Sequence, residues 1–152
     1  MLAYLAGIRG LGTQVRVGNI STMVKKSASR VLVVDDEALI RWSLTEMLSE
    51  HGYVVAEAPD ARTALTVIRQ AAEPFDVVLL DYRLPDSADL RLLETIRRIA
   101  PSSQVVMITA HNSQELSDGA AALGAYRVIN KPFEVESLAA LVHQARLAGA
   151  GK

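Results

Sequence analysis

Short apolar runs alternate along the chain with segments whose apolar residues recur at helical spacing. Five runs are predicted to be strands, at residues 30–34, 53–57, 75–80, 104–108 and 126–130. The first of them is apolar from Val31 to Val34, which is typical of a strand buried on both faces of a parallel sheet. A helical pattern follows each run, so the sequence predicts an α/β fold with a parallel sheet.

Helix boundaries follow from the apolar spacing and from capping residues. The first helix is predicted to start near Glu37 and to end at Gly52, and Asp60 is the predicted N-cap of the second. The fourth and fifth helices are predicted at about 113–123 and 134–147. The helical residues expected to face the core are Ile40, Leu44, Met47, Leu48, Leu65, Ile68, Leu92, Leu93, Ile96, Ile99, Leu116, Ala120, Leu123, Val135, Leu138, Leu141, Val142 and Ala145.

Length and composition indicate one domain with flanking segments. The chain has 152 residues, half of them hydrophobic, which suits a single domain with a substantial core. Residues 1–29 are interrupted by glycines and show no period, so we interpret them as a disordered extension or, alternatively, as a basic arm with a binding role. The domain is expected to span residues 30–147, with 148–152 as a tail that leaves no room for an output domain.

Charge and cysteine content narrow the range of functions. Residues 1–30 hold five of the 16 basic residues and no acidic one, which leaves 11 basic and 17 acidic residues for the rest of the chain. Such an acidic body is a poor surface for nucleic acid. The absence of cysteine from the sequence excludes disulfides and thiolate metal sites, and no apolar run has the length of a membrane span.

Polar side chains with related chemistry follow four of the strand-like runs. Asp35 and Asp36 come after the first run, Asp81 after the third, Thr109 after the fourth and Lys131 after the fifth. In an open parallel sheet the strand ends gather at one edge, where ligands bind. Three carboxylates, a hydroxyl and a lysine that meet there suit a divalent cation and a phosphoryl group.

This set of motifs resembles the receiver domain of two-component response regulators. The resemblance runs from about Arg30 to Ala145 and rests on the acidic pair, the Asp in Leu-Leu-Asp-Tyr-Arg-Leu-Pro, the Thr-Ala and the Lys-Pro-Phe, in that order. It implies a doubly wound, CheY-like sheet of five parallel strands in the order 2-1-3-4-5, which is the order of the family and which residue spacing alone does not specify. The stretches around Trp42 and Asp81 are most similar to receivers of nitrogen-regulation-type activators.

The resemblance implies a Mg²⁺ site. Asp36 and Asp81 would bind the ion directly, together with the backbone carbonyl of Arg83, and Asp35 would act through water. Seen alone, Asp35 and Asp36 are explained equally well as turn or helix-cap residues, because acids favour a helix N-terminus. A cation among the carboxylates would relieve their repulsion, so Mg²⁺ is expected to raise the thermal stability.

The resemblance also assigns roles in phosphoryl transfer. Asp81 would accept the phosphoryl group, Lys131 would pair with it, and the Thr109 hydroxyl would donate a hydrogen bond to it. The donor would be a phosphohistidine on a sensor histidine kinase or a histidine phosphotransfer protein. Arg83 and His111 would tune the lifetime of the phosphoryl group, unless they are only solvated loop residues. The domain would catalyse its own phosphorylation and a slow dephosphorylation without being a conventional enzyme.

Two positions depart from the family pattern. The residue three before the lysine is usually aromatic in the family, and here it is Val128. Tyr126 lies two residues away, on the same strand face by alternation, and is a candidate substitute. Asp89 follows Ala88 where the family often has a glycine. By contrast, the peptide bond before Pro132 is expected to be cis, as in the family. The departure at Val128 bears on the conformational readout and not on phosphorylation, and the one at Asp89 is expected to alter the loop before the third helix.

Three functional interpretations follow. The favoured one is a cytoplasmic single-domain response regulator that signals through its fourth helix, fifth strand and fifth helix, to a target protein or onward in a phosphorelay, with homodimer formation left open. Trp42 is expected to be partly exposed near the docking site of the phosphodonor protein, with half-buried packing as the alternative. The second interpretation is a receiver fold that binds a partner without phosphorylation. The third, a phosphatase of the haloacid-dehalogenase type, needs an Asp-x-Asp motif after the first strand, which residues 35–37 lack.

Overall fold

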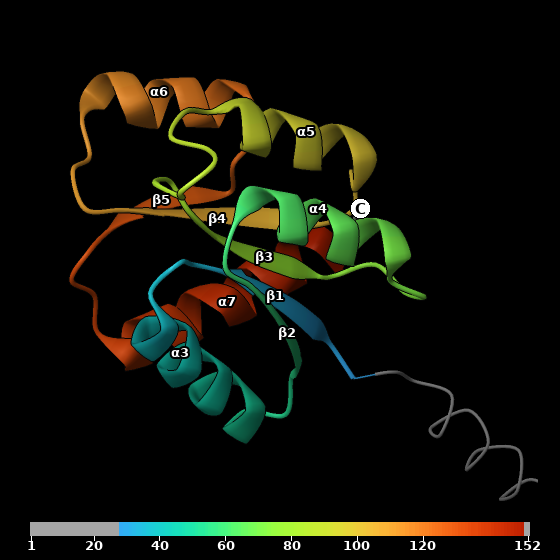
Figure 1. Cartoon of the computed structure of the whole chain (residues 1–152). Coiled ribbons are helices and arrows are strands. Elements are labelled where there is room, and N and C mark those ends of the chain that lie inside the picture. Colours follow the sequence, from blue (N-terminus) through green and yellow to red (C-terminus); the bar gives the residue numbers. More distant parts are fainter. Residues whose placement is uncertain (1–27, 151–152) are drawn as a thin grey trace, which may run out of the picture.

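A parallel sheet forms the centre of the protein, and helices cover both of its faces (Figure 1). The computed structural model describes residues 28–150, so the predictions made for residues 1–27 lie outside the described part. The strand order is β2-β1-β3-β4-β5 with every neighbouring pair parallel, which confirms the doubly wound fold and the order implied by the family resemblance. In chain order the elements are β1 (Arg30–Val34), α3 (Ala38–Glu50), β2 (Val54–Ala58), α4 (Ala61–Gln70), β3 (Val77–Asp81), α5 (Arg91–Ile99), β4 (Gln104–Thr109), α6 (Gln114–Ala122), β5 (Arg127–Asn130) and α7 (Val135–Ala150).

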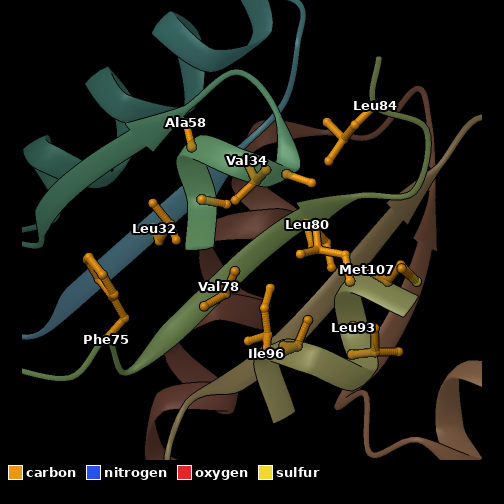
Figure 2. Packing of buried hydrophobic residues seen from close by; sticks show 14 of the residues in the cluster. Leu32, Val34, Ala58, Phe75, Val78, Leu80, Leu84, Leu93, Ile96 and Met107 are labelled. Carbon is orange, nitrogen blue, oxygen red and sulfur yellow. The ribbon is translucent and has the colours of Figure 1, made fainter. Parts of the chain in front are cut away.

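The sheet separates two hydrophobic cores. Helices α4, α5 and α6 cover one face, and α3 and α7 cover the other (Figure 1). Alternate residues of β1 enter the two cores, Leu32 and Val34 on the side of α4 and α5, and Val31 and Val33 on the side of α3 and α7. Figure 2 shows the first of these cores, with Ile96 of α5 packed against the sheet. Because both faces are covered, β1 is apolar at each of these positions.

Helices begin and end close to the capping and turn residues that were predicted from the sequence. The side chain of Asp60 accepts a hydrogen bond of 2.7 Å from the backbone N–H of Thr63 and so caps α4, as predicted. The Ser113 hydroxyl accepts one of 3.1 Å from Leu116 N–H at the start of α6. Gly52 turns the chain after α3 with a positive φ of 89°, a conformation that favours glycine. No helix in the described range 28–150 combines the length and the apolar character of a membrane span.

The structure corrects two expectations about α7. Val135 was expected in the core but is 41% exposed, because it is the first residue of the helix and lies at the rim of a surface groove, ahead of the turns that face the sheet. The helix also continues beyond its predicted end at Leu147 as far as Ala150. Gly149 lies so close to Gln104 that an added Cβ would be 3.2 Å from that side chain, and this packing against β4 accompanies the last helical turn.

Candidate functional site

The ends of the strands bring the predicted site residues to one edge of the sheet. Parallel pairing places Leu80 beside Val34 and Asp81 beside Ile108, so the loops that follow β1, β3 and β4 start at the same level. These loops and the one after β5 surround a cavity of about 380 Å³, here named the acid cavity. It is lined by Asp36, Glu37, Asp81, Tyr82, Arg83, Leu84, Pro85, Thr109, Ala110, His111 and Lys131.

Three carboxylates meet at this edge, two from the loop after β1 and one from the last residue of β3. One oxygen from each of Asp35, Asp36 and Asp81 lies within 4.8 Å of the other two. Asp35 is 1% exposed and Asp81 is 6% exposed, whereas Asp36 is open to solvent. Carboxylates this close disfavour one another's ionised form, and burial adds to that effect, so the cluster calls for positive charge.

Asp35 serves the local turn and the site at once. Its Oδ1 accepts a hydrogen bond of 2.8 Å from Glu37 N–H, which is the turn role that the sequence left as an alternative. Its Oδ2 lies 3.1 Å from Nζ of Lys131. Asp35 therefore combines the turn role with an ion pair to Lys131, one on each carboxylate oxygen.

Lys131 supplies the positive charge that the cluster needs. Its Nζ lies 3.1 Å from Asp35, 3.2 Å from Asp81 and 3.2 Å from Glu37, and its side chain is 15% exposed. Burial by itself lowers the pKa of Lys131, but the hydrogen bond to Asp35 and the charges of Asp81 and Asp35 outweigh burial and raise it. Burial, followed by the charge of Asp35, raises the pKa of Asp81 against the opposing effect of Lys131.

The loop after β3 is anchored at three points. Arg83 N–H donates a hydrogen bond of 3.3 Å to Oδ1 of Asp81, and Leu84 is buried in the core shown in Figure 2. The carboxylate of Asp86 accepts hydrogen bonds of 2.8 and 3.1 Å from the first two backbone N–H groups of α4. This role of Asp86 leaves no local signal in the sequence, because its partners lie about 25 residues earlier in the chain.

Thr109 and its neighbours close the other side of the acid cavity. Thr109 is 3% exposed, and its Oγ1 accepts a hydrogen bond of 3.1 Å from His111 N–H. His111 and Arg83 are both exposed and both line the cavity. The peptide bond between Lys131 and Pro132 is cis, as predicted.

Val128 and Tyr126 do not lie on the same face of the sheet, contrary to the expectation from strand alternation. Val128 lies beside Met107 and packs against the core under α4 and α5, whereas Tyr126 packs against the core under α3 and α7. Tyr126 precedes the first residue of β5, so the alternation of the strand does not extend to it. Tyr126 therefore does not take the place of the aromatic residue that the family has at position 128.

An apolar groove lies beside the acid cavity, between α3 and the loop that joins β5 to α7. This apolar groove has a volume of about 560 Å³ and is lined by Leu39, Ile40, Ser43, Leu44, Ala110, Lys131, Pro132, Phe133 and Val135. Leu39 is 74% exposed, and Trp42, one helical turn further along α3, is 59% exposed. The exposure predicted for Trp42 is confirmed. The groove was not predicted from the sequence. The one available signal was the position of Leu39, an apolar residue outside the inward-facing stripe of the helix.

The donor set fits Mg²⁺. This ion takes oxygen ligands and is usually held by one or two carboxylates together with water and phosphate oxygens. Asp36 and Asp81 both line the acid cavity and could hold the ion directly, whereas Asp35 is buried beside it and does not line it. Lys131 is a single cation in contact with the cluster, so three carboxylates leave negative charge for a divalent ion to balance.

Comparison with known proteins agrees with this geometry. The family model of the response regulator receiver domain matches residues 31–143. The transcriptional regulatory protein PdtaR of Mycobacterium tuberculosis is 38% identical over 112 residues, which make up 72% of this chain and 52% of that protein. The DNA-binding transcriptional regulator NtrC of Proteus hauseri is 33% identical over 115 residues, or 76% of this chain and 24% of that protein. The chain thus spans about half, or less, of the length of these relatives.

A solved structure shows the same fold over almost its whole length. The CheY-like response regulator receiver domain protein from Methanospirillum hungatei superimposes with a TM-score of 0.77 at 30% identity, covering 82% of this chain and 98% of that one. The family model covers well over half of the present chain. The chain therefore belongs to the response regulator receiver domain family of two-component signalling.

Proposed function

We propose that this chain accepts a phosphoryl group on Asp81, in a Mg²⁺-dependent reaction, from a phosphohistidine on a sensor histidine kinase or a histidine phosphotransfer protein. The observation that carries the proposal is the contact of 3.2 Å between Asp81 and Lys131 in the lining of an open cavity that Thr109 also lines. If Asp81 served only as a structural partner of Lys131, it would not need to face an open cavity or to lie beside two further carboxylates.

The reaction joins an oxygen of the Asp81 carboxylate to phosphorus. The new P–O bond forms as the P–N bond to the donor imidazole breaks, and the electron pair of that bond returns to the imidazole nitrogen, which leaves an acyl phosphate. Mg²⁺, when bound by Asp36, Asp81 and the backbone carbonyl of Arg83, supplies positive charge beside the transferred oxygens. Lys131 stays charged and can pass from Asp81 to a phosphoryl oxygen while it keeps its contact with Asp35.

Residues around the cavity control what happens to the acyl phosphate. The Thr109 hydroxyl accepts from His111 N–H and still has its own proton to donate to a phosphoryl oxygen, which would draw its loop toward Asp81. Arg83 and His111 are exposed in the lining and would set the access of water to the acyl phosphate. These contacts give the phosphorylated protein a different surface along α6, β5 and α7, through which it would bind a target or pass the phosphoryl group onward.

The apolar groove is proposed as the docking site of the histidine donor. It opens beside the acid cavity, and the two share Lys131 and Ala110 in their linings. Leu39, Trp42 and Val135 leave apolar surface exposed around it, which a partner helix with an apolar face would cover. A donor seated there would bring its phosphohistidine to the edge of the acid cavity.

A second candidate function is partner binding without phosphorylation. Val128 favours it, because the aliphatic side chain provides no aromatic ring that could swing inward when Thr109 moves, and Tyr126 packs on the other face of the sheet. In that case the acid cavity would hold a cation for stability alone. The distinction lies in whether Asp81 reacts.

Intact-mass measurement separates the two functions. The protein is incubated with Mg²⁺ and acetyl phosphate beside Asp81→Asn, with Asp118→Asn on the exposed side of α6 as the matched control. The proposal predicts the mass of one added phosphoryl group on the wild type and on the control variant, and none on Asp81→Asn. No addition to any of the three, while Mg²⁺ still binds, would favour the phosphorylation-independent function.

A further inference from the structure

Arg41 of α3 connects the acidic loop to the sheet from outside the acid cavity. Its Nη1 donates a hydrogen bond of 2.7 Å to the backbone carbonyl of Asp35, and its Nε donates one of 3.2 Å to Oε1 of Glu57 on β2. The Arg41 side chain is only 19% exposed, although the residue lines neither the acid cavity nor the apolar groove. We propose that Arg41 is a positioning residue, which fixes the peptide between Asp35 and Asp36 and thereby sets the affinity of the site for Mg²⁺. This inference rests on the metal site of the proposed function.

Asp36 is the member of the carboxylate cluster that depends most on its backbone. Within residues 28–150 its carboxylate takes part in no hydrogen bond and no ion pair, and it is open to solvent. A peptide unit is planar, so the carbonyl oxygen of Asp35 and the Cα of Asp36 turn together. Because Arg41 holds that oxygen at 2.7 Å, it also fixes the direction in which the side chain of Asp36 points from the backbone, toward Asp81.

Asp35 is tied down without help from Arg41. Its N–H donates to the carbonyl of Ala58 at 3.1 Å, its Oδ1 accepts from Glu37 N–H, and its Oδ2 pairs with Lys131. The remaining backbone group, its carbonyl, is the one that Arg41 holds. Loss of Arg41 should thus leave Asp35 in place and release the peptide that follows it.

The ion pair with Glu57 gives the Arg41 side chain a second fixed contact, and the two contacts together are here called the brace. Glu57 lies beside Val33 of β1 in the parallel register, so the second contact of Arg41 reaches the neighbouring strand. The guanidinium group presents its donors in a rigid planar fork, which suits two acceptors at fixed positions. A lysine keeps the positive charge but has one flexible ammonium group, so Arg41→Lys removes the brace and leaves the net charge of the loop unchanged.

The test measures Mg²⁺ binding directly, by calorimetry and by the rise in the thermal midpoint with added Mg²⁺. Arg41→Lys is expected to weaken Mg²⁺ about tenfold, as loss of a group that orients metal ligands typically does. With acetyl phosphate, the half-saturating Mg²⁺ concentration should rise by the same factor while the rate at saturating Mg²⁺ stays within about twofold, because Arg41 touches no reacting atom.

Glu57→Gln and the double variant show whether the fork acts as one unit. Glu57→Gln should weaken Mg²⁺ less than Arg41→Lys does, because the amide still accepts a hydrogen bond. The double variant should be no weaker than Arg41→Lys alone, since the two residues act through one brace. Arg91→Lys is the matched control, because Arg91 pairs with Asp89 at 3.1 Å with 87% of its side chain exposed, on a helix away from the acidic loop.

The outcomes separate this inference from the proposed function. A Mg²⁺ affinity of Arg41→Lys within twofold of the wild type, while Asp36→Asn binds more weakly, overturns the inference even if the midpoint without Mg²⁺ falls. Wild-type protein that binds no Mg²⁺ overturns both the metal site and the inference. Wild-type protein that binds Mg²⁺ with the predicted dependence on Arg41, yet gains no phosphoryl group, supports the inference and overturns the proposed phosphorylation.

Discussion

The acid cavity and the apolar groove lie next to each other and share Lys131 and Ala110, yet they differ in almost every other respect. The acid cavity, of about 380 Å³, is lined by charged groups, of which Asp81 and Lys131 are held in place by hydrogen bonds and ion pairs. The apolar groove, of about 560 Å³, is bordered by apolar side chains that leave much of their surface in water, Leu39 among them. The first is arranged before any ligand arrives, and the second gains its stabilisation only when a partner covers it.

This difference divides the proposed reaction into two parts. A small phosphodonor needs only the charges of the acid cavity, because positioning and electrostatics account for most of phosphoryl transfer. A protein donor must also bury apolar surface, which contributes about 1.5 to 3 kcal/mol for each large side chain that is fully covered. Variants at the two sites should therefore separate chemistry from recognition.

Lys131→Met gives the largest expected effect, because Lys131 borders both cavities and only its charge serves the acid cavity. Methionine keeps an apolar stem of similar length, so the apolar groove should change little. Asp35 and Asp81 would be left buried without their cation, and removing one partner of a buried ion pair typically costs about 3 kcal/mol. Urea unfolding without Mg²⁺ should show this loss in the free energy of unfolding.

Arg91→Met is the control for that measurement. The ion pair of Arg91 with Asp89 is exposed, and such pairs contribute about 1 kcal/mol or less. If Lys131→Met lost no more stability than Arg91→Met, the acid cavity would not depend on its lysine in the way described.

Trp42→Ala should affect only the recognition of a protein donor beside the apolar groove. Transfer from the cognate phosphohistidine protein should slow roughly tenfold in kcat/KM, as truncation of a buried aromatic anchor at an interface does. The rate with acetyl phosphate should stay within about twofold, because Trp42 does not line the acid cavity. Leu147→Ala removes an apolar side chain of similar exposure at the far end of α7 and serves as the control. Equal transfer rates for all three proteins would place the donor elsewhere.

Sequence alone specified the acid cavity better than the apolar groove, for a physical reason. Asp35, Asp81 and Lys131 each lie at or just after the end of a strand, and the topology of a parallel sheet brings strand ends together whatever the side chains are. The groove depends instead on the distance between α3 and the loop before α7. The spacing of residues along the sequence does not indicate that distance. The helical period does not distinguish the exposed Val135 from core residues, and a single exposed leucine such as Leu39, outside the inward-facing stripe, does not by itself indicate a groove.

Local rules failed where an element begins or where two distant segments meet. Val135 and Tyr126 lie at the first residue of α7 and just before β5, where the period of a helix or strand has not yet started. The contacts of Asp86 with α4 and of Arg41 with Asp35 and β2 link separate elements, and only the folded chain reveals them.

Asp81→Asn gives the smallest effect, and its sign tests how the acid cavity is built. Burial and the charge of Asp35 raise the pKa of Asp81 in the folded protein above its ordinary value of 3.8. A carboxyl whose pKa is higher in the folded state stabilises the fold fully below its unfolded pKa, and this stabilisation is lost as the pH rises through the folded pKa. Without Mg²⁺, the asparagine variant should therefore be more stable than the wild type at neutral pH.

The pH dependence distinguishes this cause from a simple packing change. The advantage of Asp81→Asn in the free energy of unfolding should be smallest at about pH 4 and should widen toward about pH 7. Asp118→Asn, at an exposed position on α6, should show no such widening. An advantage that is independent of pH would indicate a packing change, and a loss of stability at neutral pH would mean that Lys131 more than compensates the buried charge. The widening would show that the carboxylate proposed to accept the phosphoryl group destabilises the resting fold when it is ionised, so that a bound cation would supply the positive charge that this site lacks.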